Sequence, residues 1–301
     1  MNITIENKYL QDAYKRLSFL IVLIPTVSAV IGLGLVYRSG ISAWEIGLLV
    51  GMFTLTTIGL EVGFHRYFSH HAFQTNTVIR IILAVLGSMG AGGGVIYWVA
   101  HHRRHHQYTD LPGDIHSPHL HGDGIGGHLR GLWHAHVGWI FQGEITNSIL
   151  FAKDLLRDPI IAKINRLQLV WVVLGLVLPA VAGGIITGTW SGVLHGLLWG
   201  GLVRIFLVHQ FIWSTKSICH LYGSRPFATG DRSTNNFWLA IPTLGQSWHN
   251  NHHAFPNSAI VGLHWWQIDL SAWLIRSLEA VGLVWNVKTP KAATVESKKI
   301  V

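Results

Sequence analysis

Three short histidine clusters, which we call boxes, constrain this chain more than any other feature. They read His65-Arg-Tyr-Phe-Ser-His70, His102-Arg-Arg-His105-His106 and His249-Asn-Asn-His252-His253. The second and third boxes share the spacing HxxHH. Residues three and four apart lie on one face of a helix, so each of these boxes can direct three imidazoles at one point. The first box has the spacing HxxxxH, and on a straight helix its two side chains diverge, which predicts either a bend or two metals.

The boxes predict a site for two metal ions. Their eight histidines are far apart in the sequence and regularly spaced, unlike a low-complexity tract that binds metal loosely. Imidazole suits zinc, copper, iron and nickel. A zinc ion takes three or four protein ligands, so eight clustered histidines are too many for one ion.

The composition predicts an integral membrane protein. Half of the 301 residues are hydrophobic, and only 12% are charged, against about 25% in soluble domains. The mean hydropathy is +0.36. The net charge of +8 is interpreted as a sign of membrane topology, because Lys and Arg concentrate on the cytoplasmic side; no nucleic-acid partner is expected. The single cysteine, Cys219, excludes an intramolecular disulfide.

Four apolar segments are long enough to cross a bilayer. We expect a polar lead-in over residues 1–16, a membrane domain over 17–287 and a disordered tail over 288–301. The predicted spans are residues 17–37, 41–64, 168–188 and 192–213.

Topology limits the role of the apolar segment 77–99. One metal centre needs all three boxes on one side of the membrane, so this segment is expected to dip, to lie at the interface or to pack inside the protein, in each case without crossing. The four spans then form two hairpins. Most of the cations fall on the side of the boxes: Lys8, Lys15, Arg16, Arg103, Arg104, Arg130, Lys153, Arg157, Lys163, Arg166, Lys288 and Lys291. Arg38 alone falls on the other side, which predicts that the boxes face the cytoplasm.

These motifs resemble the three histidine boxes of the membrane fatty acid desaturases, of the stearoyl-CoA (delta-9) type. The resemblance rests on HRYFSH, HRRHH and HNNHHAFP, on Trp98 and on two longer stretches, which begin at Trp133 and Trp213. These stretches read WHAHVGW and WSTKSICHLYG. The resemblance covers most of residues 40–260 in matching order.

The resemblance implies a fold, a cofactor and a ligand set. The fold is all-α, with four transmembrane helices under a cytosolic helical cap that holds a histidine-rich di-metal site. The cofactor is a pair of iron ions (Fe²⁺). A ninth ligand comes from the histidine before Leu-Tyr-Gly, which is His220 here. The implied ligands are His65, His70, His102, His105, His106, His220, His249, His252 and His253.

The implied reaction is O₂-dependent introduction of a cis double bond, of delta-9 type, into a saturated acyl chain. Two electrons come from a separate ferredoxin-like or cytochrome b5-like donor with its reductase. By position, Trp98, Ile212 and Trp213 border the acyl tunnel. Its far end is expected between the first two spans, where four glycines leave room: Gly32, Gly34, Gly47 and Gly51.

The sequence departs from the family pattern at two places. Lys216 stands where an asparagine usually holds a metal-bound water, and Ala100-His101 replaces the Arg-Asp pair found in animal acyl-CoA members. The carrier of the acyl chain is therefore left open between coenzyme A, an acyl carrier protein and a lipid. Lys216 and Glu61 are expected to lie behind the ligands, with Glu61 fixing the tautomer of His65 from one turn away.

Two other kinds of function fit the same pattern. A di-iron hydroxylase of fatty acids or alkanes shares the boxes and the use of O₂. A zinc-dependent membrane hydrolase or a metal transporter needs neither O₂ nor electrons. A transporter places its ion ligands near the bilayer midplane, whereas these boxes lie at the ends of spans.

Overall fold

The computed structural model describes residues 2–300 and is mostly helical. It contains four helices that are long and apolar enough to cross a membrane, in agreement with the predicted number of spans. They cover Lys8–Ser39, Ala43–Ser69, Gln168–Thr187 and Trp190–His220. The first is the single helix α1 (Lys8–Ser39), so half of the expected lead-in belongs to a helix that Asn7 caps by accepting a hydrogen bond from the Leu10 N–H.

The second and fourth long helices change their winding along their length. The second joins α2 (Ala43–Ile58) to the π-helix η1 (Gly59–Ser69). The third is α9 (Gln168–Thr187). The fourth runs through α10 (Trp190–Gly196), the π-helix η3 (Leu197–Val203), α11 (Arg204–Ser217) and the 3₁₀ turn η4 (Ile218–His220).

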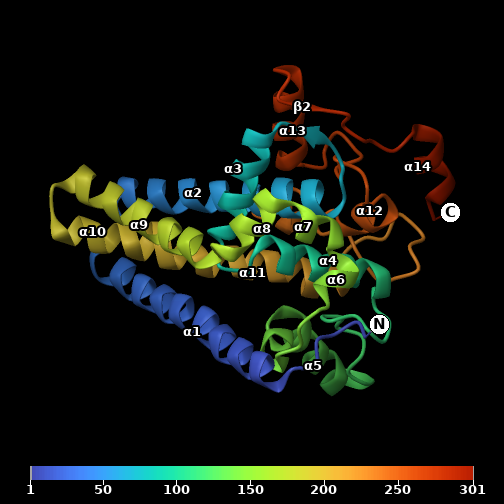
Figure 1. Cartoon of the computed structure of the whole chain (residues 1–301), viewed down its shortest axis with the longest axis horizontal. Coiled ribbons are helices and arrows are strands. Elements are labelled where there is room, and N and C mark those ends of the chain that lie inside the picture. Colours follow the sequence, from blue (N-terminus) through green and yellow to red (C-terminus); the bar gives the residue numbers. More distant parts are fainter. Residues whose placement is uncertain (1, 301) are drawn as a thin grey trace.

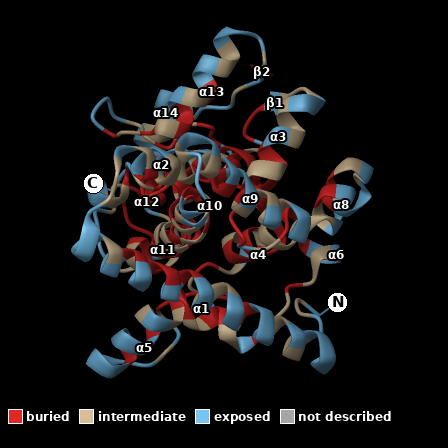
Figure 2. Cartoon of the chain, turned by 90° about the vertical axis from the view of Figure 1, so that its left-hand side faces the viewer, coloured by how far each residue is buried: buried red, intermediate tan, exposed pale blue. Residues whose placement is uncertain are grey.

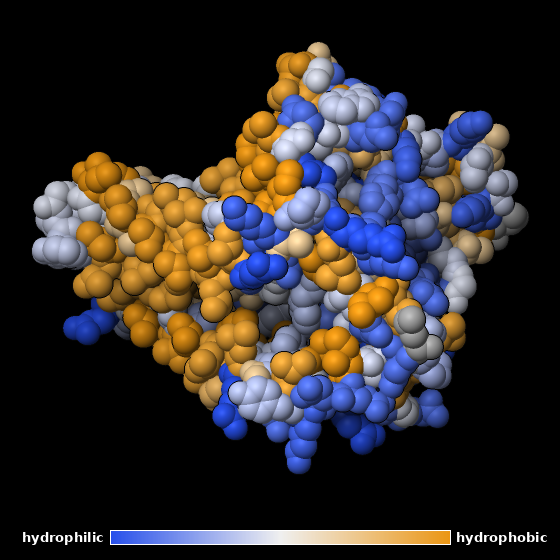
Figure 3. Space-filling view, viewed as in Figure 1, coloured by the Kyte–Doolittle hydropathy of each residue, from blue (hydrophilic) through white to orange (hydrophobic). Residues whose placement is uncertain are grey.

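The long helices form one elongated bundle, and the shorter elements gather at one of its ends (Figures 1 and 2). In Figure 1, α2, α9, α10 and α11 lie side by side, and α1 crosses diagonally beneath them. The α1–α2 and α9–α10 connections lie at the opposite end from both chain termini. Buried residues are concentrated along the axis between the helices (Figure 2). Apolar side chains cover the outside of the elongated part (Figure 3), as for Leu33 and Ile185, which are 71% and 78% exposed; such a surface suits contact with lipid.

The segment 77–99 is interrupted and too short to span a bilayer. It contains α3 (Thr77–Ser88), whose 12 residues extend about 18 Å at 1.5 Å per residue, against a hydrocarbon core of about 30 Å. A loop then leads into α4 (Val95–Tyr108). This agrees with the expectation that the segment does not cross the membrane.

Buried polar groups tie this segment to the long helices. Arg204, fully buried, donates to the carbonyl oxygens of Met89 and Gly175, both at 2.8 Å. The glycines at the crossing of η1 and α3 have no room for a side chain, because a Cβ on Gly59 would lie 2.0 Å from the Gly87 nitrogen.

The remaining elements build the compact end. Two strands pair antiparallel with Gln74 opposite Trp285, and a buried Arg66–Asp269 ion pair of 2.7 Å joins η1 to the start of α13. Phe64, Phe68 and Val99 belong to one buried apolar core. The elements are β1 (Gln74–Thr75), α5 (Gly124–His136), η2 (Gly138–Gln142), α6 (Ser148–Phe151), α7 (Lys153–Arg157), α8 (Pro159–Arg166), η5 (Phe237–Leu239), α12 (His249–Ala254), α13 (Leu270–Ala280), β2 (Val284–Trp285) and α14 (Ala292–Lys298).

The tail differs from the expectation of disorder over 288–301. It forms α14, Val295 packs against a cluster around Phe227 and Phe255, and the Lys298 ammonium donates to the Ala254 carbonyl at 2.7 Å. The backbone docks this segment too, through the bridge between Phe227 and Lys299 and through the N–H groups of Ala228 and Ile300, which donate to the carbonyls of Lys298 and Pro226. The polar composition of the segment gives no sign of these contacts. Val301 lies outside the described residues.

Candidate metal centre

The π-helix η1 resolves the spacing of the first box. On an α-helix, at about 100° per residue, five residues amount to about 500°, so the two histidines would point about 140° apart. A π-helix bonds residue i to residue i+5, and the His70 N–H donates to the His65 carbonyl at 3.2 Å. His65 and His70 therefore lie one turn apart on the same side, and this local winding is the bend that the spacing predicted.

The structure brings all nine predicted ligand residues together, in two neighbouring groups. Within each group the candidate ligand atoms lie within 4.8 Å of one another. We call them the five-histidine group and the four-histidine group. The first comprises His65, His70, His102, His106 and His252, and the second comprises His105, His220, His249 and His253. Each HxxHH box contributes to both groups, whereas both histidines of the first box enter the same one.

The spacing of ring nitrogens fits shared metal ions. Two nitrogens that bind one ion at about 2.1 Å and at a right angle lie about 3.0 Å apart. The Nε2 atoms of His70 and His102 are 2.7 Å apart, and those of His252 and His106 are 2.9 Å apart. In the other group, the Nε2 atoms of His249 and His253 are 3.1 Å apart. The donor set is nitrogen alone, which suits iron, zinc or copper.

Burial keeps five of these imidazoles in the neutral form that binds metal. Burial and then neighbouring histidines hold the pKa values of His102, His106, His249 and His252 well below the usual range. Burial and then neighbouring histidines and arginines lower the pKa of His70 to about 3. The lone pairs of these five imidazoles are therefore available to a metal.

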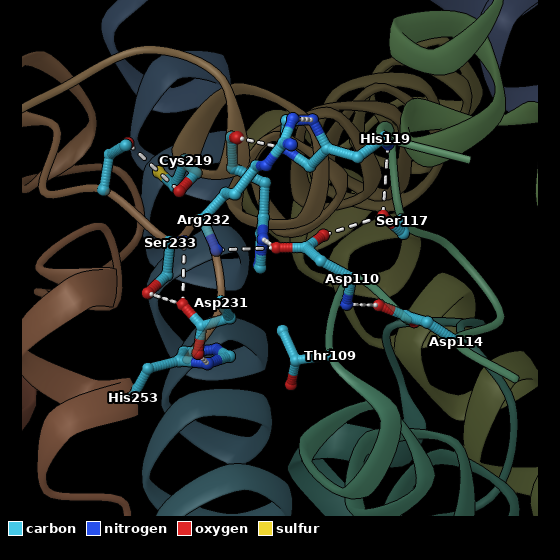
Figure 4. Close-up of polar contacts among 12 residues, drawn as sticks. Thr109, Asp110, Asp114, Ser117, His119, Cys219, Asp231, Arg232, Ser233 and His253 are labelled. Carbon is cyan, nitrogen blue, oxygen red and sulfur yellow. Dashed lines mark hydrogen bonds and ion pairs between the residues drawn. The ribbon is translucent and has the colours of Figure 1, made fainter. Parts of the chain in front are cut away.

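Three aspartates stand behind the four-histidine group. Asp114 accepts from His105 Nδ1 at 3.0 Å, Asp110 from His220 Nδ1 at 3.1 Å and Asp231 from His253 Nδ1 at 2.9 Å. Figure 4 shows these three carboxylates, with Asp231 aimed at His253 and Asp110 between Ser117 and Arg232. Such contacts fix the tautomer that leaves Nε2 free for a metal.

These contacts also set the charge of the aspartates. Burial alone would raise the pKa of each one, but hydrogen bonds from the histidines and the nearby backbone hold the pKa values of Asp110, Asp114 and Asp231 below the ordinary range. The carboxylates therefore stay ionised and add negative charge behind the ligands. The sequence analysis did not assign these aspartates a role. The signal was the Leu111-Pro-Gly-Asp114 turn, which returns the chain to His105.

The two residues expected behind the ligands are both placed near them. Glu61 Oε2 lies 3.6 Å from His65 Nδ1, longer than a hydrogen bond. Gln246 Nε2, which the sequence did not single out, lies 3.2 Å from His65 Nε2. Lys216 lines a pocket of about 20 Å³ between the two groups, together with Glu61, His105 and His249. Among the described residues, His195 and His209 join neither group.

A cavity of about 330 Å³ adjoins the five-histidine group. Trp98, Ile212 and Trp213, expected along an acyl tunnel, all line it, and so does His102. Trp98 stacks on His102 at 5.1 Å between ring centroids. The cavity reaches α1 at Tyr14, Leu17, Ser18 and Ile21, and a hollow is visible between α1 and the helices above it (Figure 3).

The expected far end of the tunnel is wrong. Gly34, Gly47 and Gly51 face open space, and Gly32 packs on Trp199. None of the four lines the cavity, whose lining includes Leu60 and Val208. Helix α1 packs on η3 and α11 instead of on α2, so no lined space forms between the first two spans. Small residues signal close approach only where another element covers them.

Comparison with known proteins agrees with the geometry. A model of the fatty acid desaturase family matches residues 39–288. The chain is 53% identical over 299 residues to a hex-5-enoyl-[acyl-carrier protein] acetylenase of Moorena producens, covering 99% of this chain and 93% of the relative. It is 34% identical over 254 residues to an sn-1 stearoyl-lipid 9-desaturase of Anabaena variabilis, covering 83% and 86%.

A third relative broadens the range of substrates. The chain is 31% identical over 271 residues to an icosanoyl-CoA 5-desaturase of Limnanthes douglasii, covering 87% of this chain and 70% of the relative. The names of the relatives thus differ in acyl carrier and in the position of reaction. The two histidine groups and the family match over residues 39–288 support the family and do not depend on which carrier or position is used. This chain is a member of the fatty acid desaturase family, an oxidoreductase that acts on acyl chains.

Proposed function

We propose that the two histidine groups hold two iron ions and that the chain dehydrogenates an acyl chain with O₂. The observation that carries this proposal is the division of the histidines into five and four beside one cavity that Trp98, Ile212 and Trp213 line. Bound iron would activate O₂, which takes two hydrogens from the acyl chain, two electrons and two protons and leaves as two waters. The electrons come from a separate ferredoxin-like or cytochrome b5-like donor.

The protein's own residues position the chain and keep water away. Trp98, Ile212 and Trp213 offer apolar surface, and burial of each methylene contributes about 0.8 kcal/mol. Because methylenes have no polar group, the carbon that reacts is selected by the shape of the cavity and by the anchor of the polar end.

We favour a short acyl chain on an acyl carrier protein as the substrate, with a double or triple bond as the product. One observation supports it: the 53% identity to a relative named for hex-5-enoyl-[acyl-carrier protein]. The second candidate is cis delta-9 desaturation of a long acyl lipid or acyl-CoA, supported by the 34% identity to a stearoyl-lipid 9-desaturase.

The topology that goes with this proposal has two hairpins and one cap. The four long helices cross the membrane, and the connections at Gly40 and Gly188 lie outside. The histidine groups face the cytoplasm, within reach of a soluble carrier and electron donor. The excess of cations at that end supports this orientation.

The test is product analysis with purified, iron-reconstituted protein. Hexanoyl and hex-5-enoyl carrier protein, and separately stearoyl lipid and stearoyl-CoA, are supplied with O₂ and a reduced ferredoxin system. We expect loss of two hydrogens from the short chains, read by mass spectrometry. A mass gain of one oxygen would establish the hydroxylase alternative, and conversion of stearoyl substrates alone would establish the second candidate.

A further inference from the structure

Lys216 places an unpaired cation in the cavity beside the histidine groups. Its ammonium lies 4.5 Å from the ring centroid of Trp139, and among residues 2–300 no oxygen accepts a hydrogen bond from it. The residue lines both the cavity of about 330 Å³ and the pocket of about 20 Å³ between the two groups. The nearby carboxylate of Asp114 is already bound to His105.

The wall around Lys216 is rich in polar atoms that lack partners. Tyr97, His101, His116 and Trp139 line the same cavity. In the described part of the chain, no hydrogen-bond partner is found for Tyr97 Oη, His101 Nε2, His116 Nδ1 or Trp139 Nε1. Each unsatisfied buried group costs about 1–3 kcal/mol, and an acyl chain of methylenes alone cannot offset that cost. A ligand that carries a hydrogen-bond acceptor can.

The position of Lys216 sets how far this acceptor lies from the reacting carbons. Lys216 follows Ile212 by four residues on α11, so the two side chains share a face one turn apart, about 6 Å along the axis. Ile212 and Lys216 also line the pocket between the histidine groups. An oxygen held by Lys216 therefore lies beside that pocket, which suits a short acyl chain.

We propose that Lys216 binds the acyl oxygen of a short substrate, the thioester carbonyl or a free carboxylate, and so fixes which carbons reach the metals. This inference rests on the proposed function. It adds the residue that would hold the polar end of the substrate and so determine how far from that end the reaction occurs. A long chain that reacts far from its polar end would press methylenes against the unpaired ammonium. A short chain places its oxygen there and its terminal carbons at the histidine groups.

The test compares Lys216→Met with Lys163→Met, which makes the same chemical change at an exposed position on α8. Two probes are used: the N-acetylcysteamine thioester of hexanoic acid, and free hexanoate. The binding of each probe is measured by calorimetry on metal-loaded protein in detergent. We expect binding of at least one of the two to weaken about tenfold or more in Lys216→Met and to stay unchanged in Lys163→Met. The affected probe identifies thioester or carboxylate, and Lys216→Arg should restore part of the binding.

Metal content and elution volume are measured for each variant to establish that it is folded. Unchanged binding of both probes in a folded, fully loaded Lys216→Met protein would overturn the inference. So would a loss of metal with undiminished binding, which would assign Lys216 to the metals. If the unmodified protein converts short chains while Lys216→Met binds them equally well, only this inference fails. If the unmodified protein binds and converts only stearoyl substrates, the proposed short-chain function is itself wrong, and the inference about Lys216 is overturned with it.

Discussion

The two histidine groups differ in what stands behind their ligands. Aspartates contact three of the four histidines in the four-histidine group, at 2.9–3.1 Å. In the five-histidine group, among the described residues, Glu61 provides the one carboxylate contact, at 3.6 Å from His65. Carboxylates raise the basicity of a ligated imidazole and fix its tautomer. A metal held by the four-histidine group would therefore have more basic imidazole ligands and more negative charge behind them than one held by the five-histidine group.

Asp231→Asn should weaken metal binding by about 10- to 100-fold. The amide removes the negative charge that Asp231 places 2.9 Å from His253 Nδ1 but keeps the size of the side chain. Competition with a chelator, followed by metal analysis, measures the change. Asp123→Asn, at an exposed position before α5, serves as the control. Equal retention of metal by both variants would mean that Asp231 is only structural.

At the scale of elements, two of the long helices that lead to ligands contain π-helical turns, whereas α4 and α12, which carry the other two boxes, are regular α-helices. The π-helix η1 carries His65 and ends at His70, and η3 precedes α11, which leads to His220. π-Helical turns occur frequently at functional sites because they reorient side chains. Here η1 puts two residues five apart into one group, which a regular α-helix cannot do.

Gly59→Ala should destabilise the protein, whereas Gly47→Ala should not. A Cβ on Gly59 would lie 2.0 Å from the Gly87 nitrogen and 2.4 Å from the Leu86 carbonyl carbon, so α3 would have to move away from η1. Gly47 meets nothing within 4 Å, and in a helix Ala is favoured over Gly by about 1 kcal/mol. Thermal unfolding in detergent measures both. A drop in the Tm of Gly47→Ala as large as that of Gly59→Ala would contradict the assigned packing.

Arg204→Met should lower the Tm more than Arg276→Met. Arg204 donates to the carbonyls of Met89, Gly175 and Gly200, and each carbonyl left unpaired costs about 1–3 kcal/mol. Arg276 forms an exposed pair with Glu279, of the kind that contributes about 0–1 kcal/mol. Equal Tm values for the two variants would show that the loop at Met89 does not depend on this side chain.

The sequence predicted the number of long helices and the residues that gather at the metal centre, because both depend on local pattern. Apolar length defines a span, and a histidine spacing defines a helix face. It did not predict the aspartates behind His105, His220 and His253, since these contacts depend on how loops return in three dimensions. It misplaced the end of the cavity for the same reason. The sequence does not show that α1 packs on η3, and this packing leaves Gly47 and Gly51 facing open space.

At the scale of the whole molecule, one end should face the cytoplasm and the other the outside. The chain has a single cysteine, Cys219, which is buried, so new cysteines can be labelled with little background. Ser39→Cys lies at the end of α1, near the α1–α2 connection, and Asp123→Cys lies before α5, at the end that holds the histidine groups.

Because cations concentrate on the cytoplasmic side of membrane proteins, a membrane-impermeant maleimide should label Ser39→Cys in intact cells and Asp123→Cys only after permeabilisation. Asp123 is an informative probe because it lies on the same compact end as both histidine groups, so its side is theirs. Labelling of Asp123→Cys in intact cells would put the metal centre outside. A cytosolic carrier protein and electron donor would then be unable to reach it. The proposed topology would be wrong, and so would the proposed carrier and electron donor.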